Sequence, residues 1–239
     1  MTASAMALHV HFVRHEEVAS HRGDVPLTLQ GQQRAAAIAQ HFSGLFEPNE
    51  VVTFLHAPTQ RTRETALAVY NVMSDTLTRD ERTIHLLPPT RNDALRNPDL
   101  YVAGERVEMV SSVEALAEQL PAGRVSNEAL EHLLFWRNFW SHPDRIGYWV
   151  NHPNPPGEDA GAVARRLLTF AISMLDLPRT QPRRYLCVTH SPVIRAFLMR
   201  SLSVSDPGEP EYGESVNLHF PPDREMTVHY RDRSRTFLC

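Results

Sequence analysis

Short apolar runs alternate with amphipathic stretches along the chain. Strands are predicted where apolar, β-branched and aromatic residues gather between polar or proline-containing segments, at 8–13, 51–55 and 185–189. Helices are predicted where apolar residues recur at the helical period, after Thr28, after Thr59, after Gly157-Glu158 and after Ser191-Pro192. Strands that alternate with helices predict an α/β fold of three layers, in which helices cover both faces of a mostly parallel sheet.

Further segments complete the organisation that we expect for a single domain over 1–239. A third strand is expected at 83–87, where Pro88-Pro89 would end it. In 97–156, prolines, asparagines and polar turns separate short helical stretches, which indicates an inserted helical cap rather than a continuation of the sheet. The runs 216–220 and 226–230 predict a hairpin around Pro221-Pro222. The arginine-rich residues 231–235 are expected to form a solvated tail.

The amino-acid composition excludes several classes of reaction and of binding partner. All 24 positions counted as Lys or Arg are arginine, which excludes lysine-dependent mechanisms such as Schiff-base catalysis. The 13 histidines supply groups that titrate near neutral pH. A net charge of -4 argues against binding to nucleic acid or to a membrane surface, and two cysteines make neither a disulfide framework nor a metal quartet. We expect a cytoplasmic protein, because no apolar run is long enough for a membrane span or a signal peptide.

Arginines and histidines follow three of the predicted strands. Arg14 and His15 end the first strand, Arg61 lies in the first turn after the second, and His190 follows 185–189. Ligands of open α/β sheets bind outside the carboxyl ends of the strands, so these side chains are expected to converge. Guanidinium groups at helix N-termini form an anion site, because free N–H groups and the helix dipole add to their charge. A dianionic phosphoryl group suits such a site.

Four stretches around these residues resemble the motifs of the histidine phosphatases, also called the phosphoglycerate mutase-like superfamily. Residues 12–17 resemble the opening Arg-His-Gly motif of the family, and 24–31 resembles the loop and helix start that follow it. Residues 57–66 are similar to the Ser-Pro-x-x-Arg-x-x-x-Thr-Ala stretch that carries the second arginine, and 188–195 is similar to the second-histidine motif. The match follows the family order along nearly the whole chain and leaves the cap unmatched.

The resemblance implies a phosphatase that hydrolyses the phosphate monoester of a small molecule without metal or cofactor. It implies that His15 is the nucleophile and becomes a phosphohistidine. Arg14 and Arg61 would clamp the phosphoryl group and stabilise the charge of the transition state, and His190 would donate to the same oxygens.

A general acid must also protonate the leaving alkoxide. In the family this is a carboxylate downstream of the second arginine, and Asp93 fits that place best, with Asp99 and Glu105 as alternatives. Glu158 resembles the segment that heads the helix before the second histidine. It is a candidate for substrate binding through a hold on Arg14 or another pocket residue.

Departures from the family motifs leave other functions open. Glu16 stands where the family most often has glycine, and a carboxylate there would repel phosphate unless it turns away; Ala57 replaces a serine. One alternative is phosphoryl transfer of the phosphoglycerate mutase type, which needs additional cationic groups. Another is a module that binds phosphate or a phosphoprotein without catalysis.

Two clusters have alternative interpretations. The aromatic residues of 135–149 fit the core of the cap or the surface of a homodimer; as an apolar lid, they would instead favour a bulky organic group on the substrate. With His15, His9 and His11 form a His-x-His pattern that could bind zinc in a barrel hydrolase. A barrel needs about 250 residues and eight strand-helix repeats, so we interpret both as packed or edge strand residues.

Overall fold

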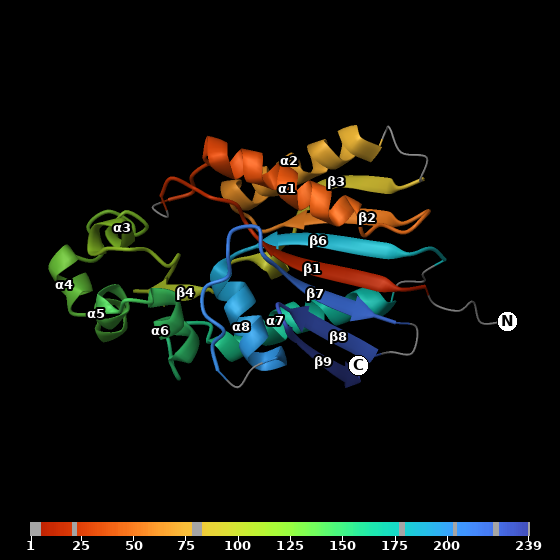
Figure 1. Cartoon of the computed structure of the whole chain (residues 1–239). Helices are drawn as coiled ribbons and strands as arrows, with labels where there is room; N and C mark the ends of the chain where they lie inside the picture. The colour runs from red at the N-terminus through yellow and green to blue at the C-terminus, as the bar shows by residue number, and fades with distance from the viewer. Residues whose placement is uncertain are drawn as a thin grey trace.

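A seven-stranded mixed sheet forms the centre of the computed structural model, which describes residues 6–20, 23–77, 83–176, 180–202, 205–221 and 225–238 (Figure 1). The strands lie in the order β3-β2-β6-β1-β7-β8-β9. They span β1 Leu8–Arg14, β2 Val51–His56, β3 His85–Arg91, β6 Arg183–Thr189, β7 Ser215–Phe220, β8 Glu225–Tyr230 and β9 Arg233–Leu238.

Strands β1, β6, β2 and β3 are parallel, and the C-terminal strands continue the sheet in antiparallel pairs. β1 lies between β6 and β7, with Phe12 opposite Cys187 on one side and Val216 on the other. The register brings Arg14 level with Thr189, so the residues after β1 and β6 emerge at the same edge of the sheet. This arrangement confirms the predicted α/β fold with a mostly parallel sheet.

Helices cover both faces of the sheet (Figure 1). α1 (Leu29–Ser43) and α2 (Gln60–Leu77) pack on one face, and α7 (Ala160–Ser173) and α8 (Ser191–Ser201) pack on the other. Thr28 caps α1 as predicted, because its hydroxyl accepts from the N–H of Gly31. The buried residues of α1 recur at the helical period, so one apolar stripe faces the sheet: Ala35, Ile38, Ala39 and Phe42.

The cap is built on the chain between β3 and α7. It holds the short helix η1 (Asp93–Leu95), a hairpin of β4 (Leu100–Val102) and β5 (Glu105–Val107), and the helices α3 (Val113–Ala117), α4 (Asn127–Glu131), α5 (Leu134–Ser141) and α6 (Arg145–Asn151). Trp136 and Trp149 are buried in one cluster with residues of α7 and α8. The apolar core of the cap is therefore continuous with the core under the sheet.

Local structure differs from the sequence predictions in three places. β3 continues through Pro88-Pro89 to Arg91, which the sheet tolerates because β3 is an edge strand bonded to β2 alone. The cap contains the β4-β5 hairpin as well as helices; its two-residue turn places Ala103 and Gly104 at positive φ. Residues 233–238, expected as a solvated tail, form the exposed edge strand β9.

Three further sequence predictions concern the C-terminal hairpin, the last cysteine and the absence of a membrane span. The predicted C-terminal hairpin is present as β7 and β8, whereas Pro222 of its expected turn lies outside the described residues. Cys239 lies outside them as well. Within the described ranges, no helix combines the length and the apolar character needed to cross a bilayer.

Candidate active site

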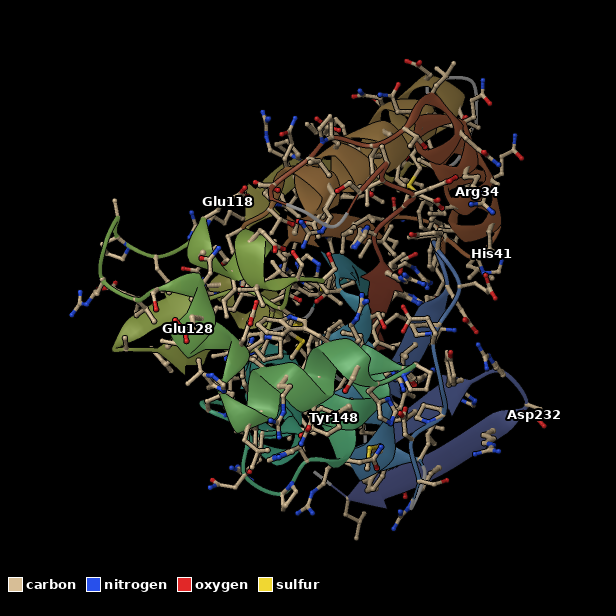
Figure 2. All side chains as sticks on the ribbon, turned by 90° about the vertical axis from the view of Figure 1, so that its left-hand side faces the viewer. Arg34, His41, Glu118, Glu128, Tyr148 and Asp232 are labelled. Atoms are coloured by element: carbon tan, nitrogen blue, oxygen red, sulfur yellow. The ribbon has the colours of Figure 1, made fainter. Side chains whose placement is uncertain are left out.

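A pocket of about 680 Å³ lies where β1, β2 and β6 end, between the sheet and the cap. The residues at the strand ends contribute Arg14, His15, Thr59, Arg61, His190 and Ser191 to its lining. The cap contributes Asn97, Glu108, Met109, Val110, Phe139, Arg145 and Ile146. Figure 2 looks onto the end of the molecule that carries the cap, with Glu118 of the pocket wall labelled. The four side chains on which the sequence prediction rested thus meet in one cavity.

His15 is held in a single tautomer. Its backbone N–H donates to the carbonyl of Thr189 at 3.0 Å, which ties the residue to the end of β6. Its Nδ1 lies 2.7 Å from the carbonyl oxygen of Glu16. A carbonyl oxygen only accepts, so Nδ1 carries the proton and Nε2 keeps its lone pair. The buried ring of His15 is therefore prepared to act as a nucleophile through Nε2.

Arg14 is fixed by the loop that precedes β7. Its Nη2 lies 2.9 Å from Oε1 of Glu209, and Nη1 donates to the carbonyl of Pro210. The guanidinium carbon lies 4.1 Å from the centroid of the Tyr212 ring, a distance suited to a cation–π contact. These contacts leave Nε of Arg14 buried with no hydrogen-bond acceptor among the described residues.

Arg61 is the second buried arginine of the pocket. Its Nη1 lies 3.7 Å from Oδ1 of Asp24, and its Nε is likewise buried with no acceptor among the described residues. Burial lowers the pKa of Arg61, but guanidinium stays protonated in proteins. A buried N–H donor without an acceptor costs free energy. Two such donors in one cavity indicate that an anion is the natural ligand.

His190 ends β6 and stands at the N-cap of α8, although its side chain makes no capping bond. The rings of His190 and His15 meet edge to face with their centroids 5.3 Å apart. Nε2 of His190 lies 3.5 Å from the hydroxyl oxygen of Thr59. The second histidine is therefore close enough to act on the same anion as His15.

Asp93 does not reach the pocket. Its carboxylate is 63% exposed and accepts from Nε of Arg91 at 2.9 Å. The residue starts η1, where Asn92 is the capping side chain. The assignment of Asp93 as the general acid at the phosphate site is therefore wrong in its geometry, because the side chain turns to the surface arginine of β3.

The two alternative acids are also held away from the cavity. Burial raises the pKa of Asp99, but hydrogen bonds from Arg96 and Arg106 outweigh it and lower that pKa to about 2. Glu105 is paired with Arg124. Neither residue lines the pocket, so both alternatives are excluded by placement as well.

Glu158 has a structural role in place of the expected contact with substrate. Its carboxylate bonds Nη2 and Nε of Arg166 at 3.0 and 3.2 Å and accepts from the backbone N–H of Asp99 at 2.9 Å. Its carbonyl accepts from Nε1 of Trp149 at 3.0 Å. Glu158 therefore joins the cap to α7 outside the pocket, which corrects the prediction that it binds substrate.

Glu16, the residue expected to repel phosphate, is buried away from the cavity. It does not line the pocket, and its backbone N–H donates to the hydroxyl of Thr65 at 3.0 Å. Burial raises the pKa of its carboxyl. The added Cβ of any residue at position 213 would meet Oε1 of Glu16, so Gly213, at a φ of 73°, is required beside it.

Two of the carboxylates that line the pocket, Glu108 and Glu209, were not predicted as site residues from the sequence. Glu108 follows β5, and no signal marked it because the segment was not recognised as a hairpin. Glu209 reaches Arg14 from 195 positions away in the chain, and no local pattern predicts such a contact. Among the described residues no group of histidine, cysteine and acidic side chains is arranged to hold a metal ion.

Comparisons with known proteins agree with this geometry. The model of the histidine phosphatase superfamily (branch 1) matches residues 10–84, the segment that carries Arg14, His15 and Arg61. No curated protein matches the chain in sequence. Among solved structures, "Mycobacterial hydrolase 1" is 14% identical with a TM-score of 0.54, over 97% of this chain and 97% of that one.

A mycobacterial glucosyl-3-phosphoglycerate phosphatase complexed with VO3 has the same fold. It is 14% identical with a TM-score of 0.51, over 98% of each chain. At this identity the likeness shows the fold alone, which is the phosphoglycerate mutase-like α/β fold. Residues 10–84 thus match the histidine phosphatase superfamily (branch 1), and the chain as a whole shares its fold with these solved structures.

Proposed function

We propose that the protein is a metal-independent phosphatase that hydrolyses a phosphate monoester through a phosphohistidine at His15. The observation that carries this proposal is the pair of buried, unsatisfied Nε groups of Arg14 and Arg61 beside the lone pair of His15. They supply two positive charges and two donors for the equatorial oxygens of a phosphoryl group.

The reaction proceeds in two displacements. Nε2 of His15 attacks phosphorus, the P–N bond forms, and the P–O bond to the alcohol breaks while the leaving oxygen takes a proton from an acid. Water then attacks the phosphohistidine and gives a proton to the same group, and the P–N bond breaks to release phosphate. Arg14, Arg61 and His190 stabilise the charge of both transition states.

The cap supports a substrate with a bulky apolar part. The pocket, at about 680 Å³, has the size of a site for a small organic molecule rather than for phosphate alone. Met109, Val110, Phe139 and Ile146 form an apolar wall on its cap side. Trp136, Phe139 and Trp149 are all buried, but of these three aromatic residues only Phe139 lines the pocket. Phe139 is thus the candidate of the aromatic cluster 135–149 for a contact with substrate.

One observation favours the mutase-type alternative. Arg145, an exposed residue at the start of α6, lines the pocket and has no ion-pair partner among the described residues. Its neighbour Asp144 is engaged by Arg195. A second anionic group on a substrate, such as the carboxylate of a phosphoglycerate, would find a cation there. The non-catalytic module, by contrast, loses support, since Glu16 is turned away from the phosphate site.

The test of the phosphatase is turnover of p-nitrophenyl phosphate in the presence of a chelator. We expect wild-type protein to turn over and to form an acid-labile phosphoenzyme, and His15→Ala to fall to the uncatalysed background. The control is His41→Ala, since His41 is exposed on α1. Equal rates for wild type and His15→Ala, while both bind phosphate, would exclude the proposed mechanism. Transfer of the phosphoryl group to a second alcohol rather than to water would favour the mutase.

A further inference from the structure

Four carboxylates line the described pocket, and the reaction needs one of them as the proton donor to the leaving group. They are Asp24, Glu108, Glu118 and Glu209. We propose that Glu108 is the general acid and base of the reaction and that Asn97 positions it. The inference rests on the proposed phosphatase function and names a residue that lies outside the family motifs of the sequence.

Two of the four carboxylates serve the arginine clamp. Oε1 of Glu209 lies 2.9 Å from Nη2 of Arg14, and Oε2 lies 3.2 Å from Nη1 of Arg195. Both oxygens of Glu209 are thus engaged by guanidinium groups. Oδ1 of Asp24 lies 3.7 Å from Nη1 of Arg61 and accepts the backbone N–H of Gln60 at 2.7 Å, so this carboxylate is held at the start of α2.

Glu108 is held differently. Oε2 accepts from Nδ2 of Asn97 at 2.7 Å, and Oε1 accepts from Nη2 of Arg106 at 3.0 Å. Its side chain is 34% exposed, and Gln119 fixes its backbone by bonding both the N–H and the carbonyl. One of its two side-chain partners is thus a neutral amide rather than a second cation.

Glu108 also lies near the phosphate clamp. Burial lowers the pKa of Arg61, and two carboxylates raise it; the charge of Glu108 has a larger effect than that of Asp24. Both residues line the one pocket, so a phosphate held at Arg61 would bring its leaving group into the same cavity as the Glu108 carboxylate.

The side chain of Asn97 also indicates that the pocket binds a ligand beside Glu108. The residue is buried and lines the pocket, and its Oδ1 is a buried acceptor without a donor among the described residues. Because a buried unsatisfied acceptor costs free energy, a donor supplied by the bound substrate or by the attacking water would fill this place. Asn97 is thus a positioning residue between Glu108 and the leaving group.

Glu108 would give a proton in the first displacement and take one back in the second. As the P–N bond to His15 forms and the P–O bond breaks, the leaving oxygen takes the proton of Glu108, which becomes a carboxylate. That carboxylate then accepts a proton from the water that attacks phosphorus. When the P–N bond breaks, phosphate leaves, the lone pair returns to Nε2 of His15, and Glu108 is protonated again.

Glu108→Gln tests the inference, with Glu128→Gln as the control, since Glu128 is exposed on α4 and does not line the pocket. For an alkyl phosphate we expect Glu108→Gln to lower kcat by about 10²- to 10⁴-fold, the usual contribution of a general acid. For p-nitrophenyl phosphate, whose leaving group needs no proton, phosphoenzyme should still form. It should then accumulate, because the base for its hydrolysis is missing. Glu128→Gln should behave as wild type with both substrates.

The outcomes separate this inference from the proposed function. If Glu108→Gln matches Glu128→Gln on alkyl and aryl substrates while wild type still forms a phosphoenzyme, Glu108 is not the acid and the phosphatase stands. If neither wild type nor Glu108→Gln forms a phosphoenzyme, the proposed function itself fails.

Asn97→Ala tests the positioning role through a pH profile. The amide of Asn97 donates to the carboxylate of Glu108, so its loss should move the limb of the kcat/KM profile that the general acid governs to higher pH. A variant with a lower rate but an unmoved profile would show that Asn97 acts only as packing.

Discussion

Arg14 and Glu209 form an ion pair inside the phosphate pocket, with Nη2 and Oε1 2.9 Å apart. The other carboxylate oxygen of Glu209 accepts from the hydroxyl of Ser191 at 2.6 Å and lies 3.2 Å from Arg195. Glu209 thus connects the arginine clamp to the start of α8. The same carboxylate places a negative charge beside the site for an incoming phosphate.

Glu209→Gln should tighten the binding of inorganic phosphate. The amide oxygen can still accept from Arg14, whereas the repulsive charge is lost. For one partly exposed charge we expect the Kd to fall about two- to fivefold. Calorimetric titration with phosphate measures the change. Glu214→Gln is the control, since Glu214 pairs with Arg231 outside the pocket and its loss should leave the Kd unchanged. Weaker binding in Glu209→Gln would mean that the charge acts mainly by holding Arg14 in place.

Arg195 joins the cap to the sheet through a buried charge. Its side chain is 0% exposed, and it bonds Asp144, which caps α6, at 2.6 Å and also bonds Asp206. Arg195→Leu removes the cation and leaves Asp206, which is largely buried, without its partner. We expect the free energy of unfolding to fall by about 3 kcal/mol or more, the usual cost of breaking a buried pair. Denaturation in urea measures this loss.

Asp144→Asn is the matched comparison for Arg195→Leu. The side chain of Asp144 is 51% exposed, and asparagine still caps a helix. We therefore expect a loss of about 1 kcal/mol or less, because water screens the exposed partner. Equal losses for the two variants would show that the stabilisation comes from the N-terminal capping of α6 by Asp144 rather than from the buried guanidinium of Arg195.

The sequence was sufficient to predict which strand ends line the pocket. Arg14, His15, Arg61 and His190 each follow a strand or begin a helix, and parallel strands bring such positions to one edge. The pattern therefore predicted the central elements and the convergence of these four side chains together. Glu108 and Glu209 could not be predicted in the same way, because long-range packing of the cap and of the loop before β7 brings them to the pocket.

The errors have related physical causes. Pro88-Pro89 suggested the end of a strand, but β3 is an edge strand, and its register against β2 shifts at these two prolines. Asp93 and Glu158 had suitable positions along the sequence, yet both carboxylates are bound by arginines outside the pocket. In a chain whose cations are all arginine, an acidic residue has many strong partners besides the active site.

Gly157 cannot accept a side chain at the junction of cap and α7. It has a φ of 142°, and an added Cβ would collide with the backbone carbonyl of Asp99. Gly157→Ala should lower the free energy of unfolding by about 2 kcal/mol or more, because both strain and the collision oppose the folded state. In Gly123→Ala, where φ is 76° and the space is open, strain alone should cost about 1 kcal/mol. Similar losses in thermal unfolding for the two variants would show that the collision is relieved by a small shift.

Acid should destabilise the protein through His11. Burial, followed by the charge of Arg184, lowers the pKa of His11 to about 3. Nδ1 donates to Oδ1 of Asn217 at 2.6 Å and Nε2 accepts from Nη1 of Arg184 at 2.7 Å, so both contacts require the neutral ring. The unfolded chain takes up this proton near pH 6.5, whereas the folded protein takes it up only near pH 3. The stabilisation is therefore complete above about pH 6.5 and is lost as the pH falls toward 3.

Urea denaturation at a series of pH values measures this effect. In that window His11 should contribute a slope of about 1.4 kcal/mol per pH unit to the free energy of unfolding. His11→Gln has no ionisable ring, so its curve should be flatter than that of wild type by this amount. His132→Gln, which changes an exposed histidine next to α4, is the control and should keep the wild-type slope. An unchanged slope in His11→Gln would assign the acid sensitivity to the carboxylates paired with arginine, such as Asp99.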